Sequence, residues 1–437
     1  MKETLDLCIQ LQTSIQLACA SILNSTGQFI GGVFFEHFRS SRKEKSLSNP
    51  KESILAEVDT LADDLDQISR LLYENPETAY TEYQSCRLLC KFLEDHGFSV
   101  KSPVGGLETA FYAETAKTGT AGPKIAFLAE YDALEKIGHG CGHNMIAAMS
   151  LGAATALRNA FPNLAGSIVV IGTPAEEGGG GKARLADAGV FEAVDAAMMT
   201  HPGHDNLPGE NTLGRIKATT EFFGRTAHAA AAPEMGLNAL DAMVGAYNNI
   251  SALRQQTTDD SRIHGIITHG GDVPNVIPDY TSALFYIRAG TKEVLDRLFQ
   301  RFQDCCNGAA LAAGCRCKVG IKPPSLDPIK RNRTLESLWA EEAALLGLEI
   351  IEKDKPSGST DLGNLSWIIP VIQPFVAICD REVALHSTGF ADATRSRRGR
   401  KAMLDGAKAL AMCGLDYLSS PEIQKAVRVE FETAAGR

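Results

Sequence analysis

Cysteine, histidine and glutamate side chains lie in short polar segments of this chain, and their types suit metal-assisted hydrolysis. Cys141 and His143 are two residues apart in a glycine-rich loop, so both can turn toward one ion. Glu176 and Glu177 are adjacent and precede four glycines. Because neighbouring side chains diverge, one carboxylate can bind a metal while the other accepts a proton from a water acidified by that metal. Each segment taken alone also fits an ordinary polar loop.

Two further histidines follow apolar stretches. His201 comes directly after the segment 196–200, and His386 follows the apolar stretch 371–378. A single histidine is as often structural as functional. Cysteine, histidine and carboxylate together, however, form a credible ligand set for zinc, nickel or manganese. Asp132 could orient a ligand imidazole through a hydrogen bond, so these residues jointly predict a metal centre.

Strands that alternate with helices must position these residues. The apolar runs 124–128, 167–173 and 196–200 are typical of buried strands, and 145–161 has helical composition. This order predicts a mostly parallel sheet covered by helices on both faces. Ligands of such sheets gather at the carboxyl ends of the strands, where the polar segments lie. Helical spacing of apolar residues also occupies 54–72, 82–97 and 400–418.

The pattern changes between residues 215 and 325. Strands and helices there follow the order β-α-β-β-α-β, which is typical of a ferredoxin-like α+β domain. The segments concerned are 215–225, 238–254, 263–269, 280–289, 292–313 and 316–321. We therefore expect a small domain, residues 215–325, inserted into an α/β domain made of residues 51–214 and 326–437. Residues 1–50 are interpreted as a helical extension of unclear role.

Composition excludes several classes of protein. The 437 residues carry a net charge of -10, which argues against a nucleic-acid partner. No apolar stretch reaches the roughly 20 residues that a membrane span needs, so we expect no membrane partner. The 11 cysteines have no regular spacing and indicate free thiols in a reducing, cytoplasmic compartment. The basic run 395–401 is interpreted as a solvated helix start or loop.

In their order along the chain, these motifs resemble the M-twenty metallopeptidase family. The closest likeness is to its branch of auxin-conjugate hydrolases, p-aminobenzoyl-glutamate hydrolases and β-alanyl-lysine dipeptidases. That branch carries a Cys-Gly-His loop, a Pro-Ala-Glu-Glu turn, a histidine after the next strand and a late His-Ser motif. The resemblance spans about residues 54–418. Glu130 stands where many members have aspartate.

The resemblance implies a zinc-peptidase-like catalytic domain with two divalent metal ions. Zinc is the expected metal, with manganese, nickel or cobalt as alternatives. Glu176 is implied as the general base, and Asp132 belongs to the motif that precedes the metal loop. The implied metal ligands, with Cys141 bridging, are Cys141, His143, Glu177, His201 and His386.

Segment 224–242 resembles the family's lid motif. His228 in this motif is implied to reach the substrate carbonyl in the partner subunit of a homodimer formed through the lid domain. Asn275 and Arg288 correspond to lid positions implied to contact the substrate, and an arginine suits a carboxylate. The loop 358–364 resembles a Gly-Ser-Thr-Asp loop of the family. Its first residues are expected to form a wall of the substrate pocket: Gly358, Ser359 and Thr360.

The predicted function is metal-dependent hydrolysis of an amide bond in an N-acyl amino acid or a dipeptide-like molecule. Two alternatives stay open. The same site could form amide bonds in a biosynthetic pathway if the lid excludes water. The chain could also be a non-catalytic binding protein on a hydrolase fold, since a fold does not fix a function.

Overall fold

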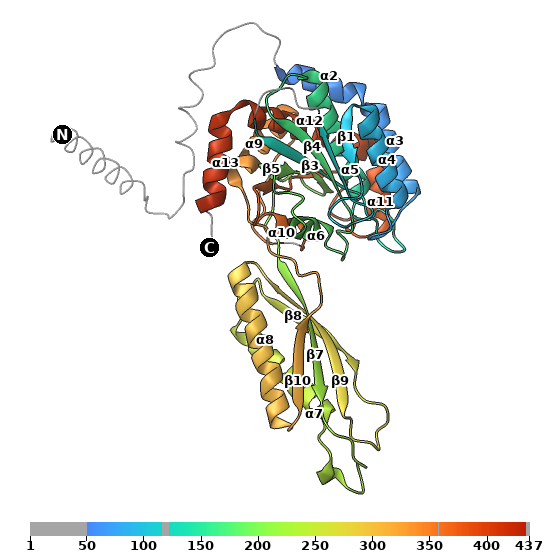
Figure 1. Ribbon diagram of the computed structural model, residues 1–437, viewed down its shortest axis with the longest axis vertical. Helices are drawn as coiled ribbons and strands as arrows, with labels where there is room; N and C mark the ends of the chain where they lie inside the picture. Colours follow the sequence, from blue (N-terminus) through green and yellow to red (C-terminus); the bar gives the residue numbers. More distant parts are fainter. Residues whose placement is uncertain (1–49, 116–121, 357, 434–437) are drawn as a thin grey trace, which may run out of the picture. The chain divides into compact units, whose positions relative to one another are not determined.

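A six-stranded mixed sheet forms the centre of the larger part of the chain. The computed structural model describes residues 50–115, 122–356 and 358–433. Parallel pairing joins four of the strands, and antiparallel pairing adds the last two at one edge. In sheet order (Figure 1) the strands are β1 (Phe98–Lys101), β2 (Phe111–Thr115), β4 (Ser167–Thr173), β3 (Lys124–Glu130), β5 (Ala196–Met198) and β11 (Val371–Ile372).

Alternate residues of β3 enter two hydrophobic cores, one on each face of the sheet. Ile125 and Phe127 belong to a core that includes α3, α5 and α12, whereas Ala126 and Leu128 belong to a core that includes α6 and α10. Because both faces are buried, the central strands β3 and β4 have continuous apolar stretches rather than alternating ones. The helices around the sheet are α2 (Pro50–Thr60), α3 (Ala62–Glu74), α4 (Tyr83–Asp95), α5 (His143–Ala160), α6 (Gly181–Asp187), α9 (Arg333–Leu345), α10 (Leu362–Leu365), α11 (Thr388–Thr394), α12 (Arg397–Ser419) and α13 (Pro421–Thr433).

The parallel strands end at one edge of the sheet, and this edge carries the polar motifs. β3 ends at Glu130, two residues before Asp132, and β4 ends at Thr173, just before the Pro-Ala-Glu-Glu turn. His201 follows β5 and opens the short strand β6 (His201–Gly203), which pairs in parallel with β12 (Phe375–Ala377). The edge predicted from the sequence therefore exists.

Residues between the two halves of this α/β part form a second, four-stranded antiparallel sheet, which we call the small sheet unit. Its strands and main helices follow one another in the predicted order β-α-β-β-α-β, and in the sheet the strands lie in the order β10-β7-β9-β8. Two helices pack on one face of this sheet around a separate hydrophobic core. Its elements (Figure 1) are β7 (Gly214–Phe223), η1 (Pro233–Met235), α7 (Ala239–Leu253), η2 (Arg254–Gln256), β8 (Arg262–His269), β9 (Tyr280–Ala289), α8 (Lys292–Ala312) and β10 (Arg316–Ile321).

The structure corrects one predicted element. The segment 54–72, predicted as one helix, forms α2 and α3, which meet at Leu61 with a ψ of -3°. Residues on both sides of this bend, such as Val58 and Leu65, are fully buried in the same core. Both short helices therefore pack on the same core despite the break.

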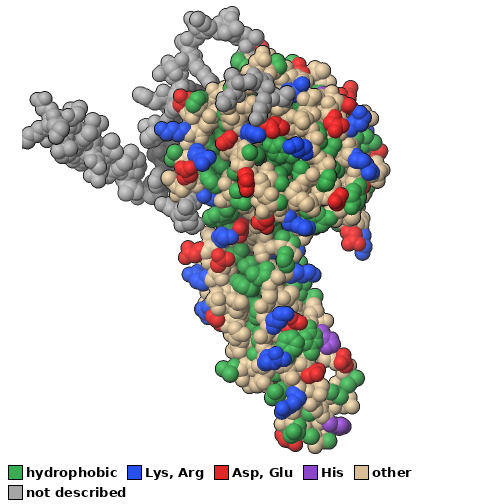
Figure 2. Space-filling view, in the orientation of Figure 1, with side chains coloured by type: hydrophobic (Ala, Val, Ile, Leu, Met, Phe, Trp, Pro, Cys, Tyr) green, Lys and Arg blue, Asp and Glu red, His purple; other side chains and the backbone are tan. Residues whose placement is uncertain are grey.

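The remaining expectations concern charge and compartment. The face in Figure 2 intersperses Lys and Arg with Asp and Glu rather than gathering them into one basic patch. The run 395–401 leads into α12, and four of its basic side chains pair with carboxylates. The nine cysteines among the described residues have free thiols. Within the described ranges no helix has the length and apolar character to cross a membrane. The predicted helical extension lies, apart from Pro50, outside the described residues.

Candidate metal centre and active site

The loop before α5 brings Cys141 and His143 to the sheet edge. Gly142, between them, has a φ of +83°, a left-handed conformation that favours glycine. A Cβ atom at Gly142 would lie only 2.4 Å from Cγ of Pro202, so there is also no room for a side chain at this position. His143 is the first residue of α5 and is fully buried, and Cys141 is 8% exposed. The glycine thus turns two ligand side chains inward.

Asp132 fixes the orientation of two neighbouring residues of the site. The Nδ1 of His143 lies 2.9 Å from the backbone oxygen of Asp132 and 3.2 Å from its carboxylate, and both oxygens accept. The other carboxylate oxygen of Asp132 accepts the backbone N–H of Glu177 at 2.9 Å. Nε2 of His143 points away from Asp132, as it does in other ligand histidines that a carboxylate orients, and Oε1 of Glu130 lies 3.0 Å from it.

A strained turn after β4 separates the two adjacent glutamates. Ala175 has a φ of +62°, which costs a non-glycine residue energy. Its backbone N–H donates to the carboxylate of Glu82, at 2.9 Å, and Glu82 is fully buried. Burial raises the pKa of Glu82 to about 7, against the effect of the hydrogen bonds it accepts. This turn sends the side chains of Glu176 and Glu177 in different directions.

His201 and His386 approach the loop of Cys141 from two other segments. His201 donates from Nδ1 to the backbone oxygen of Pro202 at 2.7 Å, and its Nε2 lies 3.7 Å from Sγ of Cys141. Burial lowers the pKa of His201 to about 4, so its imidazole is neutral, as a metal ligand must be. His386 has a φ of +60°, and its backbone N–H donates to the oxygen of Gly140 at 3.0 Å.

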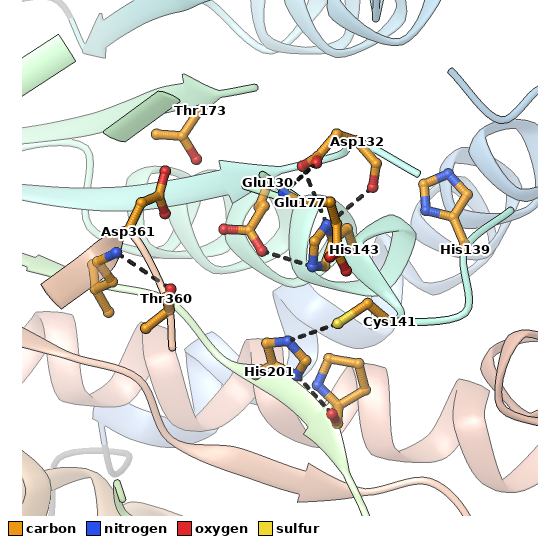
Figure 3. A network of polar contacts seen from close by, with 12 residues as sticks. Glu130, Asp132, His139, Cys141, His143, Thr173, Glu177, His201, Thr360 and Asp361 are labelled. Atoms are coloured by element: carbon orange, nitrogen blue, oxygen red, sulfur yellow. Dashed lines mark hydrogen bonds and ion pairs between the residues drawn. The ribbon is translucent and has the colours of Figure 1, made fainter. Parts of the chain in front are cut away.

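These side chains form groups that could each hold a metal ion. The first contains Cys141, His143 and His201 (Figure 3), and the second contains Cys141, Glu177 and His386. Within each group the ligand atoms lie within 4.8 Å of one another. All five predicted ligands are therefore brought together, and Cys141 belongs to both groups, as a bridging ligand would.

The donor atoms fit divalent metal ions. Oε1 of Glu177 is buried and has no hydrogen-bond partner among the described residues; Nε2 of His386 lies 3.5 Å away. Burial raises the pKa of Cys141 to about 12, so a thiolate there requires a neighbouring positive charge. Sulfur, nitrogen and oxygen donors of this kind suit zinc and its neighbours in the first transition series.

Glu176 belongs to neither of the two groups that contain Cys141. It is partly exposed, and together with Glu130 and His143 it forms a further group of close ligand atoms. Desolvation, and then the carboxylates of Glu130 and Asp361, raise the pKa of Glu176 well above its usual value. A carboxyl group with a raised pKa can both take and return a proton near neutral pH.

The sequence did not single out a buried ion cluster next to this site. The ammonium of Lys182 contacts the carboxylate of Glu130, and it lies 2.6 Å from Oδ1 of Asp361. The other Glu130 oxygen lies 3.0 Å from Nε2 of His143. Burial by itself would lower the pKa of His143, but Glu130, Cys141 and Asp132 together raise this pKa well above its usual value. A lysine just after four glycines was the available signal for this cluster.

Replacing Lys182 by methionine is expected to lower the free energy of unfolding by about 3–5 kcal/mol. The substitution keeps the volume but leaves Glu130 and Asp361 facing one another, both at most 1% exposed. Urea unfolding of the purified protein measures the change. The matched control is Lys91→Met, which removes an exposed pair with Asp95 and should cost less than about 1 kcal/mol. An equal decrease in the free energy of unfolding for both variants would show that the buried cluster contributes no more to stability than an exposed ion pair.

The remaining predicted site residues belong to none of these groups of close ligand atoms. His228 and Asn275 are neighbours in the small sheet unit, where the N–H of Ala229 donates to the oxygen of Asn275 at 3.1 Å. Arg288, on β9, donates from Nη1 to Oγ of Ser359 at 2.8 Å. The other two loop positions are Gly358, which is exposed, and Thr360, which is buried and accepts the N–H of Leu362.

Comparisons with known proteins agree with this geometry. Residues 124–409 match the profile of Peptidase family M20/M25/M40. The chain is 40% identical to the Xaa-Arg dipeptidase of Mus musculus over 86% of its own length and 90% of that protein. It is 28% identical to one of the p-aminobenzoyl-glutamate hydrolase polypeptides of Escherichia coli, over 86% of this chain and 92% of that protein.

Two solved structures share the fold. The aminobenzoyl-glutamate utilization protein of Klebsiella pneumoniae superposes with a TM-score of 0.65 at 21% identity, over 82% of this chain and 97% of that one. A dinuclear metal-binding M20 peptidase of Bacillus subtilis gives a TM-score of 0.65 at 21% identity, over 83% and 99%. The family predicted from the motifs is confirmed: the chain belongs to Peptidase family M20/M25/M40 and is a metal-dependent hydrolase of amide bonds.

Proposed function

We propose that this enzyme cleaves an N-acyl amino acid or dipeptide at a centre of two divalent metal ions. His143 and His201 would hold one ion, Glu177 and His386 the other, and Cys141 would bridge them. The observation that carries this proposal is that Cys141 belongs to both groups of close ligand atoms. Names of the relatives support the substrate class, since they are a dipeptidase and a p-aminobenzoyl-glutamate hydrolase.

In the proposed mechanism, Glu176 moves the proton. When bound, the metal pair supplies Lewis acidity, which polarises the amide carbonyl and acidifies a water molecule. The Glu176 carboxylate accepts the proton of the attacking water and returns it to the nitrogen of the leaving amine. Asp132 keeps His143 and the turn at Glu177 in place through the hydrogen bonds described above.

His228 is proposed to stabilise the negative charge that develops on the carbonyl oxygen. Its Nδ1 accepts the N–H groups of Ala230 and Ala231, at 3.3 and 3.2 Å, so the neutral ring carries its proton on Nε2. The side chain is exposed on the small sheet unit. An exposed imidazole with a fixed Nε2–H can donate to an oxyanion of a second subunit. We therefore propose residues 215–325 as a lid through which two copies pair, and residues 51–214 and 326–437 as the catalytic domain.

A complementation experiment tests whether His228 acts in the partner's site. His228→Ala alone should lower kcat about 10²- to 10³-fold, which is the usual effect of removing one oxyanion donor. Co-expression with Glu176→Gln should restore about a quarter of wild-type activity, because half of randomly mixed dimers are hybrid and each has one intact site. Activity no higher than that of the separate variants would contradict action in trans, as would a fully active monomer in sedimentation.

The substrate side of the site is proposed to include Asn275, Arg288 and the loop residues Gly358, Ser359 and Thr360. Arg288 is held by Ser359 and can bind a carboxylate through two parallel hydrogen bonds. Zinc is the proposed metal, with manganese, nickel and cobalt as alternatives, because a cysteine-containing site suits all of them. A cytoplasmic location remains a prediction.

Hydrolysis of a panel of N-acyl amino acids and dipeptides tests the proposed function. The metal-depleted protein should be inactive, and activity should return on addition of zinc, manganese, cobalt or nickel. Comparing cleavage with condensation of the same acid and amine separates a degradative from a biosynthetic enzyme. Metal binding without turnover in either direction would instead favour a binding protein on this fold.

A further inference from the structure

The open face of the small sheet unit carries a row of three arginines. Arg215 on β7 lies opposite Arg288 on β9, and Arg288 lies opposite Arg262 on β8. Residues paired in this way across a sheet share a face. Helices α7 and α8 cover the other face, where Ile216 and Ile287 are buried. The row therefore stands on the face without helices.

Arg215 differs from an ordinary surface arginine. Its Nε and Nη2 atoms are buried and have no hydrogen-bond partner among the described residues. The guanidinium carbon lies 5.5 Å from the ring centre of Tyr286, and that of Arg288 lies 5.9 Å from the same ring. Arg262, by contrast, is exposed and donates to the backbone oxygens of its own turn. Arg215 is thus held in place with its donors unused.

These unused donors form the edge that a carboxylate binds best. Nε–H and Nη2–H lie side by side on the guanidinium and can point at the two oxygens of one carboxylate. Buried polar groups of native proteins are nearly always hydrogen-bonded, so such a pair indicates a missing ligand. Burial lowers the pKa of Arg215, but a guanidinium keeps its charge in proteins.

The position of Arg215 connects it to the proposed active site. Lys217 lies two residues after Arg215 on the same strand. Its Nζ donates to the backbone oxygen of Gly178 at 3.2 Å, and Gly178 belongs to the turn that carries Glu176 and Glu177. The carboxylates of Glu176 and Asp361 also act on Arg215 electrostatically, though neither forms an ion pair with it. The unused donors thus lie beside the turn with the proposed base.

We propose that Arg215 and Arg288 together bind a leaving amino acid that carries two carboxylates, as glutamate and aspartate do. This inference rests on the proposed function and names its substrate class. Arg288, held by Ser359, would take the α-carboxylate, and the free edge of Arg215 would take the side-chain carboxylate. A cationic side chain would face two guanidiniums and Lys217. The preference for arginine in the name of the dipeptidase relatives is therefore not transferred to this chain.

Three dipeptides that share the same alanyl group test the proposal: alanyl-glutamate, alanyl-glutamine and alanyl-arginine. For the metal-loaded wild type, kcat/KM should be highest with alanyl-glutamate. Arg215→Gln should lower the ratio of kcat/KM for glutamate over glutamine by about 10- to 100-fold, the usual worth of a hydrogen bond to a charged group. Arg215→Lys should keep part of the preference, and Arg262→Gln, in the same row, should keep all of it.

Two results would overturn the inference: a wild-type preference for alanyl-arginine, or an unchanged ratio in Arg215→Gln at normal metal content and melting temperature. Calorimetric binding of glutarate and butyrate separates this failure from failure of the proposed function, because it needs no turnover. Glutarate should bind the wild type more tightly than butyrate and lose that advantage in Arg215→Gln. Equal affinity of the wild type and Arg215→Gln for glutarate would contradict the proposed role of the two arginines, even if the enzyme cleaves amides. A lower glutarate affinity in Arg215→Gln would support this role, even if the enzyme cleaves no amide.

Discussion

Replacing Glu176 by glutamine is expected to lower kcat by about 10²- to 10⁴-fold while leaving two metal ions per chain. Glutamine keeps the size and the carbonyl oxygen of the side chain but cannot accept the proton of the attacking water. Glu176 is absent from both groups of close ligand atoms that contain Cys141. Its loss should therefore affect proton transfer more than metal affinity. Steady-state kinetics and metal analysis of the same preparation measure both quantities.

Glu177→Gln is the matched control, because it changes the neighbouring residue in the same way. Glu177 offers an unpartnered buried oxygen toward His386, so its replacement should remove metal as well as activity. The division of labour between the two glutamates predicts opposite metal contents for two variants that are equally inactive. Loss of metal from Glu176→Gln would make Glu176 a ligand and leave the mechanism without its base.

The arrangement of the main sheet could be predicted because it depends on patterns along the chain. The middle residues of β3 and β4 are apolar, since both faces of these strands are buried. The same rule that places ligands at the carboxyl ends of parallel strands placed Asp132, Glu177 and His201 at one edge. The backbone dihedral angles at Ala175 and His386 could not be foreseen, because only tertiary contacts impose a positive φ on these residue types.

The residues that support the ligands were harder to predict. Glu82 lies far along the chain from the turn that it holds, and nothing in its neighbourhood distinguishes it from a surface glutamate at the start of a helix. Lys182 and Asp361 are 179 residues apart and meet only in the folded structure. Buried charges of this kind depend on pairing that a single sequence does not reveal. The unused donors of Arg215 likewise required coordinates.

Replacing Cys141 by alanine is expected to remove both metal ions and to lower kcat by at least about 10³-fold, since Lewis-acid assistance is worth several kcal/mol. Sγ of Cys141 is common to the group with His143 and His201 and to the group with Glu177 and His386. His386→Ala should instead cost one ion, because His386 belongs to one of these groups. Metal analysis after dialysis against a buffer without chelator distinguishes the two variants.

The thiol also sets how metal loading depends on pH. Burial raises the pKa of Cys141 to about 12, so below that pH the metal-free protein carries a protonated thiol. Because Cys141 is shared, metal binding must release its proton once, and His143, whose pKa is also raised, must give up a proton as well. Metal affinity should therefore rise with pH. Cys305→Ala changes a thiol on α8 that packs against the core of the small sheet unit. It should leave both the metal content and the pH dependence of metal affinity unchanged. Two ions retained by Cys141→Ala would mean that the groups bind metal independently, and the bridging arrangement would be wrong.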